Sequence, residues 1–159
     1  LQKIFFQMLI EHSSQIKTEL STILVIAVSC QNRVGRFFQI KLTACGYNVT
    51  LVESKEPVNK PENHTQSNLS TYISLISEIG NREFDLCIIL YDCLHPPALS
   101  YIIEYLRENN PEIEIIVSTC CLYEDERRDM DECNVKHFLQ MPLSTSAIIK
   151  TILKITSVN

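Results

Sequence analysis

Sulfur-bearing side chains follow several of the chain's apolar runs, at the points where those runs end. Cys30, Cys93, Cys120 and Cys121 each stand one or two positions after a run, and Met141 directly follows another. Soft sulfur ligands select Cu(I) or zinc, and clustered thiols can sense oxidants. The alternative interpretation is that cysteine is a small, easily buried residue of which this chain has many.

Two oxygen-bearing residues occupy similar positions. Asp92 follows the run LCIILY, and Thr119 closes the run IEIIVST. An aspartate at the end of a strand commonly caps the next turn by accepting hydrogen bonds from backbone N–H groups. Both residues are therefore candidates for chemistry, with an ordinary structural role as the alternative.

Other catalytic patterns are missing from the sequence. It has no CxxC or HExxH spacing, and its four histidines are too widely spread to indicate a zinc site. Gly35, Gly46 and Gly80 are not clustered, so the sequence offers no phosphate-cradling loop. We therefore expect neither a flavodoxin-like enzyme nor a cofactor binder, and we expect no bound cofactor or metal.

The composition suits a single globular domain. The chain has 159 residues, of which 45% are hydrophobic and 21% charged, and its net charge is −5. Lysine and arginine are scattered, and Arg127 and Arg128 are embedded among acids, so no basic patch is evident. No apolar run is long enough to span a bilayer. We expect no nucleic acid and no membrane as partners of this segment.

Seven cysteines in a chain able to build its own core indicate buried thiols in a reducing compartment. A disulfide framework would be more typical of a smaller secreted domain. The expected location is therefore the cytoplasm, either as a free protein or as the cytoplasmic part of a larger, membrane-bound one.

Short β-branched runs alternate with amphipathic stretches along the chain. Strands are expected over 22–28, 48–53, 86–91, 113–119 and 135–140, and helices over 32–45, 69–80, 97–108, 124–133 and from 144 onwards. This alternation predicts an α/β fold: a doubly wound, five-stranded parallel sheet of the flavodoxin-like type, with strand order 2-1-3-4-5. Ligands of such sheets gather at the carboxyl ends of the strands.

Two segments lie outside this pattern. Residues 1–20 look helical, but their apolar stripe covers only about one heptad, where a coiled coil needs three or four. We expect an extra N-terminal helix that connects to a preceding domain or packs on this one, rather than a dimerisation stem. Residues 21–159 would form the α/β domain, with a polar loop insertion near 54–68.

The order of the elements and four landmark segments resemble the receiver domain of two-component response regulators, over roughly residues 21–156. The segment ILVIAVSCQNR resembles the opening strand, and YDCLHPP resembles the segment that carries the phosphoacceptor aspartate. IIVST resembles the fourth strand with its terminal hydroxyl residue, and FLQMP the fifth strand, which normally ends in Lys-Pro.

The resemblance implies that the phosphorylation site is largely dismantled. The paired acids that hold Mg²⁺ in receivers fall at Ala27 and Val28, and the lysine that pairs with the phosphoryl group falls at Met141. Asp92 matches the phosphoacceptor, because a proline follows four residues later as in the family, and Thr119 matches the hydroxyl residue.

Other positions keep the scaffold of the family. Phe138 stands where receivers carry the aromatic residue that changes rotamer on activation, and Pro142 keeps the proline that follows the lysine. Asn134 falls where a glycine often precedes the fifth strand, and asparagine tolerates the left-handed backbone that such a turn requires.

Phosphoryl transfer to a carboxylate brings two anions together, so it depends on charge neutralisation. The resemblance therefore implies a non-catalytic pseudo-receiver, a regulatory or protein-interaction domain of a hybrid histidine kinase or a related signalling protein. Its partner would be another domain of that protein, a histidine kinase or a phosphotransfer component, and a homodimer is also open. Two alternatives stay open: a phosphoaccepting receiver that uses Asp92 with atypical metal ligands, and a thiol-based metal or redox sensor.

Overall fold

The structure is a computed structural model that describes residues 22–28, 32–53, 74–91, 96–119, 124–141 and 144–156. The expected N-terminal helix over 1–20 and the expected loop over 54–68 lie outside these ranges. Within these ranges, no helix is long and apolar enough to cross a membrane.

Five strands form one sheet in the order β2-β1-β3-β4-β5, and each neighbouring pair is parallel. The strands are β1 (Thr22–Ala27), β2 (Asn48–Glu53), β3 (Leu86–Tyr91), β4 (Glu114–Thr119) and β5 (His137–Gln140). This confirms the predicted doubly wound order. The bounds of β2 and β3 are the expected ones, whereas β1, β4 and β5 each fall one or two residues short of the expected range.

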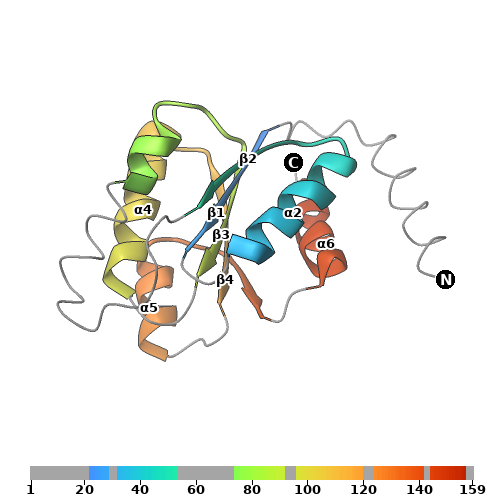
Figure 1. Cartoon of the computed structure of the whole chain (residues 1–159). Helices are drawn as coiled ribbons and strands as arrows, with labels where there is room; N and C mark the ends of the chain where they lie inside the picture. The colour runs from blue at the N-terminus through green and yellow to red at the C-terminus, as the bar shows by residue number, and fades with distance from the viewer. Residues whose placement is uncertain are drawn as a thin grey trace.

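Helices cover both faces of the sheet, as Figure 1 shows. They are α2 (Asn32–Ala44), α4 (Pro96–Asn109), α5 (Glu124–Glu132) and α6 (Thr145–Thr156), and residues 74–79 are also helical. Helices α2 and α6 pack on one face, and α4, α5 and the 74–79 helix pack on the other.

The alternation of side chains along each strand supplies both faces with apolar residues. In β1, Ile23 and Val25 belong to the cluster under α2 and α6, which we call the α2–α6 core. Leu24 and Ile26 belong to the cluster on the opposite face, which we call the α4–α5 core. Burial on both faces explains why the strands read as continuous apolar runs instead of alternating ones.

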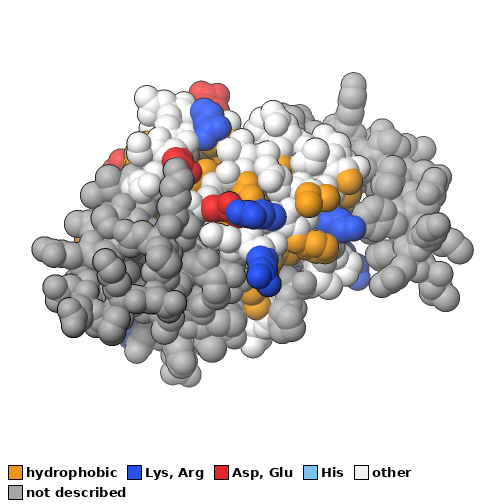
Figure 2. Space-filling view, in the orientation of Figure 1, with side chains coloured by type: hydrophobic (Ala, Val, Ile, Leu, Met, Phe, Trp, Pro, Cys, Tyr) orange, Lys and Arg blue, Asp and Glu red, His pale blue; other side chains and the backbone are white. Residues whose placement is uncertain are grey.

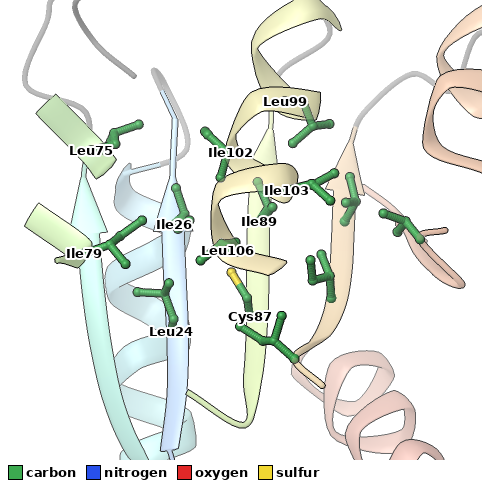
Figure 3. Packing of buried hydrophobic residues seen from close by; sticks show 14 of the residues in the cluster. Leu24, Ile26, Leu75, Ile79, Cys87, Ile89, Leu99, Ile102, Ile103 and Leu106 are labelled. Carbon is green, nitrogen blue, oxygen red and sulfur yellow. The ribbon is translucent and has the colours of Figure 1, made fainter. Parts of the chain in front are cut away.

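Figure 3 shows how the α4–α5 core is filled. Helical residues lie over strand residues, and the labelled members are Leu75, Ile79, Leu99, Ile102, Ile103 and Leu106 above Leu24, Ile26, Cys87 and Ile89. Nearly all of these side chains are aliphatic, which fits a core that is covered by helices at the ordinary spacing of a doubly wound sheet.

Three turns in the described ranges use left-handed backbone. Gly46 ends α2 with φ 94°, and Gly80 follows the 74–79 helix with φ 59°. Asn134 has φ 53° and ends the turn after α5, where the N–H of Val135 donates to the carbonyl of Met130 at 2.9 Å. The left-handed conformation expected at Asn134 is therefore confirmed, and asparagine replaces glycine there at small cost.

The amino-terminal edge of the sheet is joined by a side-chain clamp. The backbone N–H and the hydroxyl of Thr22 both donate to Oδ2 of Asp85, at 2.9 and 2.7 Å. The contact ties the start of β1 to the residue before β3. Ligands of doubly wound sheets bind at the opposite edge, where the strands end.

Candidate functional site

The ends of β1, β3, β4 and β5 lie side by side, and we call this region the carboxyl edge. The N–H of Val28 donates to the carbonyl of Leu90 at 3.0 Å, which joins the ends of β1 and β3. The N–H of Met141 donates to the carbonyl of Thr119 at 2.9 Å, which joins the ends of β5 and β4. Four of the five residues matched to the receiver site therefore lie at one edge, as expected.

Ala27 is fully buried in the α2–α6 core. Helix α2 passes close to it: a Cβ placed on Gly35 would lie 2.7 Å from the Cβ of Ala27 and 3.0 Å from Cδ1 of Leu51. Only a residue without a side chain fits at Gly35 when α2 lies this near the sheet. The position that the resemblance matches to an acid is thus an apolar contact between strand and helix.

Val28 lies on the other face. Its side chain is 6% exposed and belongs to the α4–α5 core, whereas Ala27 belongs to the α2–α6 core. The two residues that the resemblance matches to the acids of receivers therefore belong to two different cores and do not face one shared pocket. Neither side chain has an atom that could bind a cation.

Met141 also belongs to the apolar part of the edge. It is partly buried and packs against the α2–α6 core, on the same side as Ala27. A methionine there supplies a flexible apolar side chain where a receiver has an ammonium group. This part of the edge therefore offers neither a carboxylate to hold Mg²⁺ nor an ammonium group to pair with a phosphoryl group.

Thr119 keeps a hydroxyl at the edge, 4% exposed, at the end of β4. Its neighbour Ser118 is fully buried, and its Oγ finds no hydrogen-bond partner among the described residues. Sequence reasoning missed Ser118, although a serine within an apolar strand run is itself a signal. A buried hydroxyl without a partner costs free energy, so Ser118 is a weak point of the edge.

The one carboxylate paired in register with Ala27 belongs to Glu53, the last residue of β2. Arg36 of α2 holds it with two hydrogen bonds, from Nε to Oε1 at 2.7 Å and from Nη2 to Oε2 at 3.0 Å. The hydrogen bond and the charge of Glu53 raise the pKa of the Arg36 guanidinium above its ordinary value. This carboxylate is therefore engaged at the surface by an arginine.

Magnesium needs oxygen ligands, usually from carboxylates. Over the described ranges, no three or more His, Cys, Asp or Glu side chains are grouped so that they could hold a metal ion. Ala27 and Val28 offer none, and Glu53 is bound to Arg36. The described part of the carboxyl edge does not fit a bound magnesium ion.

Several sequence-based candidates lie outside the described residues. They are Asp92, the four strand-end cysteines Cys30, Cys93, Cys120 and Cys121, and Pro142. Phe138 is described: it is partly buried and packs against the α4–α5 core. Its aromatic ring therefore lies on the same face as Val28.

The described cysteines, Cys45, Cys87 and Cys133, are thiols. Cys87 is fully buried in β3, and burial raises the pKa of its thiol far above the ordinary value. Burial also raises the pKa of the half-buried Cys45 thiol, an effect that the charge of Lys41 opposes. Both groups are neutral at ordinary pH and have the character of core residues, not of reactive thiolates.

No family model matches the sequence, and no curated protein matches it. Solved structures do match its fold. A response regulator receiver domain (CheY-like) from Methanospirillum hungatei has a TM-score of 0.63 and 15% sequence identity, covering 87% of this chain and 95% of that one. The chemotaxis response regulator CheY4 of Vibrio cholerae has a TM-score of 0.60 and 14% identity, covering 84% and 98%.

A pilus assembly-related protein from Burkholderia pseudomallei is similar as well, with a TM-score of 0.56 and 18% identity, covering 87% of this chain and 90% of that one. The strand order and these matches show that the chain has the CheY-like flavodoxin fold of receiver domains. At such low identities the likeness carries the fold alone, and function has to be argued from the site.

Proposed function

We propose that this chain is a receiver-like regulatory domain of a signal-transduction protein, which binds other proteins and performs no phosphoryl transfer. The observation that carries the proposal is the burial of Ala27 and Val28 in two separate apolar cores. A receiver needs carboxylates at these positions. Here the same positions hold the fold together, and they cannot serve a metal without unpacking it.

The electrostatics support the same conclusion. A phosphoryl group that approaches Asp92 would meet a second anion, and catalysis would require cations to offset the repulsion. Met141 contributes no charge, and Arg36 is bound to Glu53. Without the metal ion and the ammonium group, the transition state would lose more than about 5 kcal/mol of stabilisation.

The fold class supports a regulatory context for the domain. A receiver-like domain without phosphoryl chemistry acts through its surfaces, by contact with another domain of the same protein or with a histidine kinase or phosphotransfer component. A hybrid histidine kinase or a related cytoplasmic signalling protein would provide that setting. In this proposal the domain is not an enzyme.

The test is a titration of the isotopically labelled protein with Mg²⁺ and beryllofluoride, a mimic of the phosphoryl group. We expect the amide spectrum to stay unchanged at millimolar Mg²⁺, because no carboxylate pair is available to hold the ion. The Asp92→Asn variant is the matched control. Saturable shifts in the parent that disappear in Asp92→Asn would overturn the proposal in favour of a phosphoaccepting receiver with atypical metal ligands.

A further inference from the structure

The two faces of the molecule carry opposite charge. Helices α2 and α6 together contain five cations and no carboxylate: Arg33, Arg36, Lys41, Lys150 and Lys154. The whole chain has a net charge of −5, so this layer is the exception. The cations are scattered in the sequence, and the fold gathers them on one side of the sheet.

The opposite layer is acidic. By sequence, α4 and α5 contain eight carboxylates and three arginines. Four of these acids are exposed in the described structure: Glu104, Glu108, Asp131 and Glu132. Counted over the helices alone, the formal charges of the two layers are therefore +5 and −5, and Glu53 of β2 offsets the charge of Arg36 on the basic side.

Each layer also exposes apolar surface. On α2, Phe37 is 45% and Ile40 66% exposed, and the ammonium group of Lys41 lies 5.6 Å from the centre of the Phe37 ring. On α4, Tyr101 is 60% exposed. These are the large hydrophobic side chains that stand out from the described surface. Figure 2 shows hydrophobic and basic side chains next to one another on the α2 side.

We propose that the α2–α6 layer of one molecule docks on the α4–α5 layer of a second copy. Cations and Phe37 would meet carboxylates and Tyr101, so both the charge and the apolar surface are complemented by the chain itself. Phe37 and Ile40 would be the central contacts, because exposed apolar side chains ringed by charge lose the most water on docking.

The geometry determines the kind of assembly. The two layers lie on opposite faces of one sheet, so the contact is head-to-tail and leaves one free face of each kind. Such a heterologous contact does not close on itself as a two-fold dimer does, and it propagates into short chains. The proposal goes beyond the function proposed above, because self-association requires neither loss nor retention of phosphoryl chemistry at the carboxyl edge.

The contact would be weak and sensitive to salt. Helix α2 has 13 residues and is therefore about 20 Å long, and a face two helices wide offers less than the ~800 Å² per partner of a standard interface. Exposed charges are screened over about 8 Å at physiological ionic strength. We expect association in the micromolar to millimolar range that weakens as salt is added.

Sedimentation velocity of the full chain tests the proposal. The parent should sediment faster as its concentration rises at low salt, and this dependence should vanish at high salt. Arg33→Glu with Lys150→Glu reverses the basic layer, and Glu104→Lys with Asp131→Lys reverses the acidic one. Each variant alone should associate at least ~10-fold more weakly, whereas an equal mixture of the two should associate again.

A matched control changes the net charge by the same amount as the acidic-layer variant, but at positions outside both layers. Glu83→Lys with Glu112→Lys alters two exposed acids outside both layers and should associate like the parent. A second measurement, on Phe37→Ser with Ile40→Ser, should show weaker association without any change in charge. Sedimentation that is independent of concentration at low salt would overturn the proposal. Salt-insensitive association that survives both layer variants would also overturn it, because it would identify a different interface.

Discussion

Ala27 is constrained from two sides. Its own Cβ faces the close approach of Gly35, and its partners in the neighbouring strands are Glu53 and Leu90. A carboxylate at this position would enter an apolar core, against which Met141 also packs without contributing a charge. The residue types at the edge therefore depend on one another, and an acid cannot be restored singly without cost.

The first prediction concerns the paired acids. Replacing Ala27→Asp together with Val28→Asp should lower the free energy of unfolding by about 2–4 kcal/mol without metal, because two carboxylates would lose solvation in the two cores. Mg²⁺ should recover little of the loss, because carboxylates that enter two opposite cores cannot share one ion. Thermal melts with and without Mg²⁺ measure both effects. Ala44→Asp, on the surface, is the control, and a double variant as stable as the parent would show that the edge is open to water.

The second prediction concerns the buried thiol of Cys87. Its pKa is raised in the folded state, so the unfolded chain loses this proton first as the pH rises. The stabilisation is complete below the ordinary thiol pKa of about 8.5 and declines above it, by at most ~1.4 kcal/mol per pH unit. Urea unfolding at several values between neutral and alkaline pH should show this decline, and Cys87→Ala should reduce its slope. If the free energy of unfolding fell equally steeply with pH in parent and variant, the Cys87 thiol would not be the cause of the decline.

The short distance between helix α2 and the sheet depends on two small residues, Gly35 and Ala27. Gly35 lies in the first half of α2 and faces Ala27 and Leu51, while Phe38 and Leu42 bury the rest of the inner face. The outer face of the same helix presents Phe37 and Ile40. The distance between helix and sheet therefore also determines how this outer surface is presented.

The third prediction follows from that contact. Gly35→Ala would add a Cβ 2.7 Å from the Cβ of Ala27, which is too close for contact. The overpacking should exceed the helix preference of alanine, so the net loss of stability should be about 1–2 kcal/mol. In the background of Ala27→Gly the same substitution should be neutral or stabilising. Chemical denaturation of the four proteins of this cycle gives the coupling free energy.

Gly46→Ala provides the comparison for that cycle. Gly46 has open space around it but a φ of 94°, so alanine there is strained by the backbone alone. Its cost should not change when Ala27 becomes glycine. If Gly35→Ala behaves in the same way, the loss does not arise from the contact with Ala27.

Local patterns were sufficient to predict most of the elements. The runs over 48–53 and 86–91 are strands with the expected bounds, and the turn at Asn134 has the expected left-handed backbone. These features depend on neighbouring residues, whose periodicity and turn chemistry are visible in sequence. The expected strand over 135–140 is two residues too long, because Val135 packs in the α4–α5 core before the ladder with β4 begins.

Contacts between distant residues could not be predicted in this way. The clamp between Thr22 and Asp85 joins residues 63 positions apart, and the close approach of Gly35 to Ala27 depends on how a helix lies on a sheet. The receiver resemblance predicts that Ala27, Val28 and Met141 are altered site positions, and this stays a prediction. Side-chain alternation along the expected strand 22–28 already predicts that Ala27 and Val28 point to opposite faces. The sequence alone could not show that both faces are tightly packed at this end of the strand.

At the scale of the whole molecule, the sheet separates a layer of basic helices from a layer of acidic helices. The sequence shows lysine and arginine scattered along its length, and no basic patch was expected from it. The crossovers place α2 and α6, which lack acids, on one face, and the acid-rich α4 and α5 on the other. A net charge of −5 therefore conceals a polarised molecule, in which the partners of the two faces should differ in sign.

The last prediction concerns the boundary of the folding unit. Every core residue that the structure describes lies between Ile23 and Ile155, so removal of residues 1–20 deletes none of them. The free energy of unfolding should change by less than about 1 kcal/mol, and the dependence on urea should stay the same because the surface exposed on unfolding of the domain is unchanged.

Urea denaturation of the full chain and of the shortened chain measures this change. As a control, a deletion that continues through Leu24 should unfold the domain, because it removes half of β1, an inner strand of the sheet. A loss above about 2 kcal/mol on removal of residues 1–20 would mean that this segment packs on the domain. A salt-insensitive dimer that becomes a monomer after the same deletion would instead establish the segment as a dimerisation stem, because apolar coiled-coil contacts are not screened as the contact between the two charged layers would be.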